Sequence, residues 1–370
     1  MEYGKTLFDP YVIPGLSERP DFWKVRAEEI IDICEKAKKP SRKEIICRTP
    51  LGYPVYALFY GNFTEDAPQS NWSAGSNSKN YRSYYGARRD GKQTFLFIAG
   101  VHGAEAESVA AAVNLIEMLE NGCDFRKKSD PELLELISAY RFIIVPCVNM
   151  DGRAISPDHL RGAHWSDFRK ASQGWWKDGE LVGWRGSKSY FPLPLSEVCY
   201  PGGYPNSEGY NIMHDACPGN LKTAEAAALM KLAERWRVDA VLNSHSCEMA
   251  PSIVGVGFNT PENEERELDI RFEINRLLHE EGLNAEEIPR GEANSRFDLN
   301  TMLSLASGAV VLTLECTVSW DHAYADDEEA PEPRSFEALM QPPFTALRGY
   351  LREGLKKPFV IRGTEEILPD

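Results

Sequence analysis

Short apolar runs alternate along this chain with longer segments that repeat apolar residues at helical spacing. Buried strands of a parallel sheet are expected to be continuous apolar runs, and the crossover helices between them are expected to be amphipathic. Strands are predicted at 44–49, 54–61, 93–100, 140–149, 238–246 and 308–316. Helices are predicted at 27–37, 105–122, 131–139, 222–236 and 264–283. The alternation predicts an α/β fold in which helices flank a largely parallel sheet.

We find no internal repeat and no clear linker in the 370 residues. The prediction is therefore a single domain over residues 1–370. Two segments interrupt the regular pattern. Residues 62–92 are polar and rich in Asn, Ser, Gly and Tyr, as expected of a surface insertion, and residues 151–220 carry Gly, Pro and aromatic residues with little periodicity, as expected of a loop-rich excursion.

The charge balance narrows the range of partners. With 41 basic and 56 acidic residues the formal charge is −15, which argues against non-specific binding to nucleic acid or to an anionic membrane surface. No stretch reaches the ~18 consecutive apolar residues of a membrane-spanning helix. The sequence leaves the oligomeric state open.

The amino terminus has no basic segment followed by an apolar run, so it does not resemble a secretory signal. The eight cysteines are scattered, no two form a Cys-x-x-Cys pair, and several stand in apolar runs. Buried, reduced thiols are the simplest interpretation. Together these features predict a cytoplasmic protein.

Three of the predicted strands are followed or closed by residues that can bind a metal or transfer a proton. His102 and Glu105 follow the strand at 93–100, and His245 and Glu315 close two later strands. Ligands collect outside the carboxyl ends of the strands in open α/β sheets. We therefore expect these four side chains to gather at one edge of the sheet.

Two histidines and a glutamate form a ligand set of catalytic zinc, which leaves a fourth position for water. The prediction is one Zn²⁺ per chain, held by His102, Glu105 and His245. Zinc lowers the pKa of water, and Glu315 would act as the general base that takes its proton. A structural ion pair is the alternative role for Glu315.

The chain resembles the zinc carboxypeptidases of the M14 type over roughly residues 45–350. Four stretches carry the resemblance, namely "AGVHGAEAE" (99–107), "VPCVNMDG" (145–152), "LNSHS" (242–246) and "VVLTLEC" (310–316). The resemblance implies a mixed, largely parallel eight-stranded sheet flanked by helices on both faces. It also implies one zinc ion and cleavage of C-terminal residues from peptides.

The stretch "GYNIMHDA" (209–216) departs from that family's pattern. By resemblance, Asn211 takes the place of an aspartate that orients the first histidine, and His214 replaces the arginine that grips the substrate carboxylate. A histidine offers fewer donors and is charged only part of the time. Either the substrate has no free carboxylate at that point, or another arginine supplies the contact, the candidates being Arg153, Arg161, Arg185, Arg290 and Arg296.

The family also has an arginine that polarises the scissile carbonyl. "DFRKAS" (167–172) is similar to its segment, which nominates Arg169, with Arg161 as the rival. The family's mobile tyrosine has no counterpart near Arg296. The aromatic loop 174–195 has three interpretations, namely a cleft wall, a satellite hydrophobic cluster or an oligomer contact.

The predicted function is zinc-dependent hydrolysis of a peptide or amide bond, carboxypeptidase-like but with altered recognition of the C-terminal carboxylate. The expected partner is a peptide or a small amide substrate. One alternative is a zinc-dependent N-deacylase similar to aspartoacylase and succinylglutamate desuccinylase. The other is a non-catalytic binding module on the same fold. Loss of a ligand or of the glutamate would favour the binding module, but all four positions are filled.

Overall fold

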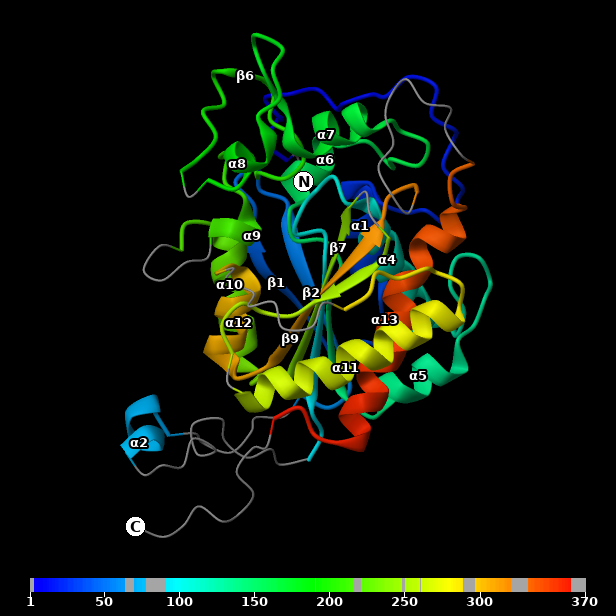
Figure 1. The fold of residues 1–370 in the computed structure, drawn as a ribbon, viewed down its shortest axis with the longest axis vertical. Coiled ribbons are helices and arrows are strands. Elements are labelled where there is room, and N and C mark those ends of the chain that lie inside the picture. The colour runs from blue at the N-terminus through cyan, green and yellow to red at the C-terminus, as the bar shows by residue number, and fades with distance from the viewer. Residues whose placement is uncertain are drawn as a thin grey trace.

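The computed structural model describes residues 3–63, 70–77, 91–189, 191–215, 221–247, 250–259, 261–288, 297–320 and 332–360. In this part of the chain seven strands form one sheet in the order β1-β2-β4-β3-β7-β9-β8 (Figure 1). Their bounds are β1 Arg42–Arg48, β2 Pro54–Tyr60, β3 Thr94–Ala99, β4 Arg141–Val145, β7 Ala240–Cys247, β8 Ser252–Val254 and β9 Val310–Thr317.

The centre of the sheet is parallel and its edges are antiparallel. β4, β3, β7 and β9 run parallel to one another, whereas β1 pairs with β2, β2 with β4 and β8 with β9 in the antiparallel sense. The predicted class, a mixed and largely parallel sheet flanked by helices, is thus confirmed. The described residues contain seven of its strands, against the eight that the family resemblance implied.

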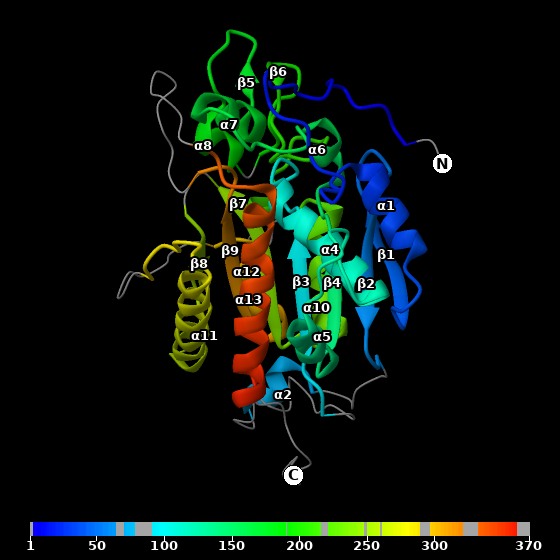
Figure 2. The ribbon, with the colours of Figure 1, turned by 90° about the vertical axis from the view of Figure 1, so that its right-hand side faces the viewer.

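Helices cover both faces of the sheet (Figures 1 and 2). One face carries α1 Ala27–Lys36, α4 Ala106–Asn121, α5 Pro131–Ser138, α11 Pro261–Glu280 and α13 Phe336–Lys356. The other face carries α9 Ile212–Asp215, α10 Ala224–Arg235 and α12 Leu299–Ser307. Each residue of β3 is buried, because helices lie on both sides, and this burial explains why the strand is a continuous apolar run.

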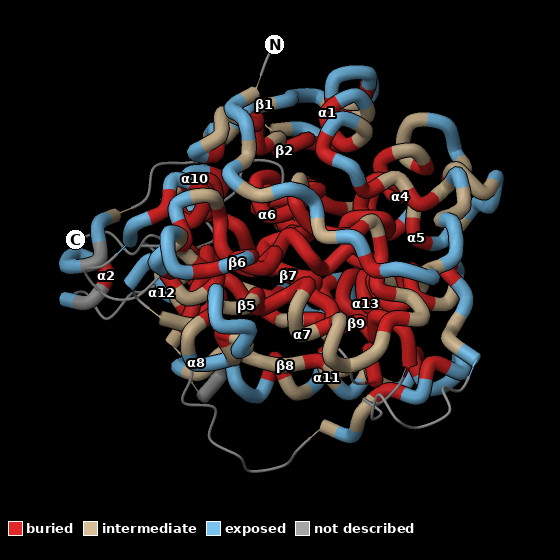
Figure 3. Tube along the Cα trace, turned by 90° about the horizontal axis from the view of Figure 1, so that it is seen from above, coloured by how far each residue is buried: buried red, intermediate tan, exposed pale blue. Residues whose placement is uncertain are grey.

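A further layer lies above the carboxyl ends of the central strands (Figures 1 and 2). It is formed by the predicted loop-rich segment, which contains short elements, namely α6 Met150–Ile155, α7 Trp165–Gln173, β5 Trp175–Trp176, α8 Gly183–Ser187 and β6 Val198–Tyr200. Seen from above in Figure 3, buried chain lies at the centre of the molecule and exposed chain at the periphery. The strand ends are therefore covered by this layer.

Outside the two irregular segments, local signals located most of the long elements but missed α12, α13 and β8. Gly122 adopts the left-handed conformation (φ 78°) that ends α4, as its position predicted. The long helix α13 was not predicted, because Pro342 and Pro343 lie inside it and resemble a helix break. β8 is three residues long, too short to show a period. Most of the 62–92 insertion lies outside the described residues, which include its helix α2, Trp72–Asn77.

Seven of the eight cysteines fall in the described residues and all seven are free thiols, with Cys34, Cys147 and Cys316 buried. Burial raises the pKa of the Cys147 thiol to about 12, so this thiol stays protonated and unreactive. Among the helices that the structure describes, none combines the length and the hydrophobicity needed to span a bilayer.

Candidate metal centre

The loop after β3 is shaped by two glycines on either side of the first histidine. Gly100 has a φ of 62°, and a Cβ there would lie 2.8 Å from Cys147 Sγ. At Gly103 a Cβ would lie 2.2 Å from the backbone nitrogen of Arg153. Only glycine tolerates such a close backbone approach. The loop is thereby held against α6, and His102 lies between the two contacts.

His102, Glu105 and His245 form a buried cluster with their donor atoms facing one another. His102 Nδ1 lies 2.8 Å from Glu105 Oε1. His245 Nδ1 lies 2.9 Å from Glu105 Oε2 and 3.3 Å from His102 Nδ1. The three residues predicted as zinc ligands are thus brought together from a loop and a strand that are 140 residues apart in sequence.

The donor set fits a zinc ion. At the usual zinc–ligand distances of about 2.0–2.2 Å, tetrahedral donors lie about 3.3 Å from one another, close to the separations observed here. Burial raises the pKa of the Glu105 carboxyl, but the two neighbouring imidazoles outweigh burial and hold this pKa below its usual range. Glu105 therefore stays ionised, which is the form that binds a cation.

Asn211 fixes the orientation and the tautomer of His102. Its Oδ1 lies 3.1 Å from His102 Nε2 and also accepts from the backbone nitrogen of Met213, while its Nδ2 donates to the carbonyl of Ser187. Because Oδ1 can only accept, Nε2 must carry the proton. In the neutral imidazole, Nδ1 then has a free lone pair directed at the cluster, as a metal ligand requires.

Glu315 lies next to His245 on the adjacent strand. The two residues are direct partners in the parallel register of β7 and β9, so their side chains leave the sheet on the same face. Glu315 is half-buried, in contrast to the fully buried cluster. Its position beside the metal ligands and within reach of solvent fits the predicted general base.

An aromatic stack extends from the cluster to the surface. The ring of Tyr204 lies 4.2 Å from that of His102, and the ring of Trp184 lies 5.6 Å from that of Tyr204. The Trp184 ring is 6.5 Å from the His214 ring and 3.8 Å from Lys188 Nζ. Trp184 is 45% exposed, so these rings extend from the buried cluster to the surface.

The stack is supported by the turn that the sequence motif "VPCVNMDG" forms. Asn149 begins α6, where its side chain accepts from Gly152, and its Nδ2 donates to the carbonyls of Tyr204 and Pro205. Tyr204 is therefore held where it contacts His102. Sequence reasoning did not identify Tyr204, Trp184 or Lys188 individually, since a loop without periodicity does not show which of its aromatic residues face a site.

Part of the aromatic loop 174–195 belongs to a satellite hydrophobic cluster, one of its three predicted roles. Trp176 packs against the satellite cluster of Val182, Leu193 and Val198. Trp175 contacts Tyr11 and Tyr200. Trp184 instead belongs to the stack beside the metal centre.

The arginines nominated from the sequence lie in different surroundings. Arg169 is half-buried in α7, where it contacts the Trp165 ring and the Gln173 side chain. Arg161 donates to the carbonyls of Pro333 and Arg334 and lies over the Phe336 ring, so its guanidinium serves to anchor the start of α13. Arg296 and Arg290 lie outside the described residues.

Glu107 is a buried carboxyl that the sequence analysis did not single out. It is fully buried in the first turn of α4, two residues after Glu105. Burial raises its pKa to about 7. A glutamate among the apolar residues of a buried helix was the signal that could have identified it.

A family model described as zinc carboxypeptidase matches residues 35–255, and no curated protein sequence matches. Among solved structures, a metallo-carboxypeptidase from Burkholderia cenocepacia is 15% identical, with a TM-score of 0.54 over 88% of this chain and 68% of that one. The Pseudomonas aeruginosa metallo-carboxypeptidase, solved with (2-guanidinoethylmercapto)succinic acid, is 14% identical, with a TM-score of 0.54 over 90% of this chain and 69% of that one. Carboxypeptidase A from Helicoverpa armigera is 14% identical, with a TM-score of 0.52 over 92% of this chain and 75% of that one.

At these identities the structural matches show the fold alone, whereas the family model covers more than half of the chain. The resemblance drawn from the four sequence motifs is confirmed. The chain belongs to the zinc carboxypeptidase family.

Proposed function

We propose that this protein is a zinc-dependent hydrolase of peptide or amide bonds, carboxypeptidase-like, in which Glu315 is the general base. The observation that carries the proposal is the buried His102–Glu105–His245 cluster with Glu315 in register beside His245. His102, Glu105 and His245 would hold a zinc ion, which would supply Lewis acidity toward a carbonyl group and water.

The residues of the chain account for the proton transfers. A carboxylate oxygen of Glu315 accepts a proton from the attacking water and passes it to the leaving amine nitrogen. Glu315 is half-buried, so the substrate can reach it, while the sheet holds its backbone in place. Arg169 is the proposed donor to the oxyanion, because it belongs to the layer above the strand ends.

The side chains proposed to contact the C-terminal end of the substrate differ from those of the family. His214 lies three residues after Asn211, which contacts the first histidine, and the Trp184 ring lies near both His214 and Lys188. We infer that His214 and Lys188 replace the family's arginine as the cationic contact, with Trp184 as an apolar wall. A lysine is a point charge and lacks the planar fork that binds a carboxylate through two bonds. Recognition of a terminal carboxylate is therefore expected to be weaker.

The direct test is Glu315→Gln, which removes the base and preserves shape. We expect the variant to keep one zinc per chain, measured by elemental analysis, and to lose hydrolysis by about a hundredfold or more. Glu132→Gln, a change at an exposed glutamate of α5, is the matched control and should retain full activity. Activity of Glu315→Gln within about tenfold of the wild type would refute the assigned role.

A substrate panel distinguishes the proposal from its alternatives. Hydrolysis of short peptides with free C-termini, and slower hydrolysis of the amidated peptides, would support carboxypeptidase-like action. Cleavage of acyl-amino acids but not of peptides would identify a deacylase. One zinc per chain with no hydrolysis of any amide tested would favour a non-catalytic binding module.

A further inference from the structure

Tyr204 packs its ring against the face of His102, which is the first of the three proposed ligands. The two ring centroids lie 4.2 Å apart and the ring planes are inclined by 31°. Both residues are buried, at 4% exposure. Asn211 reaches the imidazole at its edge, through Nε2, so Tyr204 makes a second and different contact with the same ligand.

The backbone at Tyr204 is tied to three neighbouring segments. The Gly203 carbonyl accepts a hydrogen bond of 2.7 Å from the nitrogen of Gly103, in the loop that carries the first ligand. The Tyr204 nitrogen donates to the carbonyl of Ser172 in α7, and the Tyr204 carbonyl accepts from the Asn149 side chain. The position of the ring is therefore set by hydrogen bonds that do not involve the metal cluster.

The edge contact alone does not fix the plane of the imidazole. A single hydrogen bond at Nε2 holds one corner of the His102 ring, and the ring can still turn about that corner because hydrogen bonds tolerate a range of angles. Turning out of the plane moves the Nδ1 lone pair away from the other two donors. A flat ring packed against the imidazole face opposes this movement, so the face contact supplies the orientation that the edge contact leaves open.

The stack also has an electrostatic component. The face of a tyrosine ring carries negative charge density. An imidazole that binds a cation becomes electron-poor, and an electron-poor ring over this face is attracted to it in the manner of a cation–π contact. The contact between Tyr204 and His102 is therefore stronger in the metal-bound protein than in the metal-free protein, and the difference adds to the metal affinity.

We propose that Tyr204 is a positioning residue of the metal centre, whose ring face holds the His102 imidazole in the plane that directs Nδ1 at a bound cation and stabilises that imidazole when the cation is present. The inference rests on the zinc centre of the proposed function, but not on hydrolysis. Because the ring face carries both effects, the hydroxyl group of Tyr204 is not required for either.

The test compares Tyr204→Leu, which removes the flat ring, with Tyr204→Phe, which keeps it. Competition with a chelator measures the zinc affinity, and the visible absorption of the Co²⁺-loaded protein reports the coordination geometry. We expect Tyr204→Leu to bind zinc about threefold to tenfold more weakly than the wild type and to change the Co²⁺ spectrum. Tyr204→Phe should restore the spectrum and bind within about twofold of the wild type.

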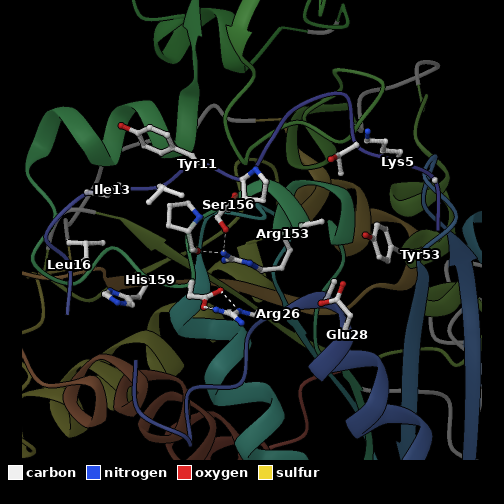
Figure 4. Close-up of a pocket in the computed structure, with 18 residues that line it drawn as sticks. Lys5, Tyr11, Ile13, Leu16, Arg26, Glu28, Tyr53, Arg153, Ser156 and His159 are labelled. Atoms are coloured by element: carbon white, nitrogen blue, oxygen red, sulfur yellow. Dashed lines mark hydrogen bonds and ion pairs between the residues drawn. The ribbon is translucent and has the colours of Figure 1, made fainter. Parts of the chain in front are cut away.

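Tyr53→Leu is the matched control. Tyr53 is 7% exposed and stacks on Tyr3, with ring centroids 4.4 Å apart. It lines a cavity of about 660 Å³ beneath the N-terminal segment (Figure 4), and none of the three proposed ligands is among the described residues that line this cavity. The variant loses a buried, stacked ring of the same size and should bind zinc as the wild type does.

A second comparison serves if Tyr204→Leu does not fold. Replacement of Tyr204 by pentafluorophenylalanine keeps the shape of phenylalanine and reverses the charge of the ring face. This protein should bind zinc about threefold more weakly than Tyr204→Phe.

Wild-type zinc affinity and Co²⁺ spectrum in Tyr204→Leu would overturn the proposal, as would an equal loss in Tyr204→Phe, because the ring face would then have no role. If Tyr204→Leu does not fold, equal zinc affinity with phenylalanine and with pentafluorophenylalanine at this position would overturn it. A wild type that binds no zinc would overturn both this inference and the proposed function. A zinc-loaded wild type without hydrolysis would overturn only the proposed function.

Discussion

Glu105 at the metal centre and Glu267 on α11 are both buried, at 3% and 4% exposure, yet their ionisation differs. Two imidazoles hold the pKa of Glu105 below its usual range despite burial. Burial raises the pKa of Glu267 to about 8, because the opposing contacts of Arg271 and Asn259 are weaker than desolvation. Burial by itself therefore does not decide the charge of a carboxyl, and the partners that face it do.

The two buried carboxyls therefore have different effects on the folded protein. The candidate metal centre keeps an anion in the interior because the two imidazoles that face it, or a bound cation, stabilise it, as required of a ligand. Glu267, in contrast, is protonated in the folded state at neutral pH. Its ionisation lowers the free energy of unfolding. Four changes to single residues test this difference.

The largest effect is expected from His102→Ala, which removes one of the partners of Glu105 and one proposed ligand. The variant should lose stoichiometric zinc and all hydrolysis, because two remaining donors hold zinc weakly. Elemental analysis after dialysis measures the loss. His279→Ala, at an exposed histidine of α11, is the control, and one zinc per chain in His102→Ala would contradict the ligand assignment.

Glu267→Gln should change how stability depends on pH. The folded pKa of about 8 lies above the unfolded value, so the folded state holds a proton that the unfolded state has lost, and this contribution to stability disappears as the pH rises through 8. The wild type is expected to lose about 3 kcal/mol from this group between pH 5 and pH 8.

In Glu267→Gln that part of the pH dependence should be absent, with the variant more stable than the wild type at pH 8. Urea unfolding at several pH values measures it. An unchanged slope would show that Glu267 ionises freely in the folded protein.

Glu225→Gln tests the same effect at a second buried carboxyl, on α10, whose pKa burial raises to about 7. The sign is the same and the expected change is smaller, about 2 kcal/mol between pH 5 and pH 8. If the effect exceeded that of Glu267→Gln, the ranking of the two sites by burial and partners would be wrong.

Asn211→Ala should have the smallest effect, about a tenfold loss in zinc affinity, at the low end for an outer partner of a ligand because a neutral amide rather than a carboxylate is lost. Competition with a chelator measures this affinity. Asn211→Asp keeps an acceptor for His102 Nε2 and should bind zinc at least as tightly as the wild type. Unchanged affinity in the alanine variant would show that His102 needs no orientation by Asn211.

Much of the fold and the centre of the site were predictable from the sequence, because their signals are local. The apolar run at 93–100 and the helical spacing after it fix β3 and α4, and parallel strands place their carboxyl ends at one edge. His102, Glu105, His245 and Glu315 follow or close such strands, so their proximity could be deduced.

Contacts between distant segments were decided only by the tertiary structure. His102 and Tyr204 meet because Asn149 ties down residues 204–205, and Arg153 becomes a buried cation only where the N-terminal segment folds across α6. No periodicity encodes such contacts, since they depend on how loops pack over a finished sheet. The sequence determined which residues are candidates for the chemistry, whereas the packing of loops determined what surrounds each of them.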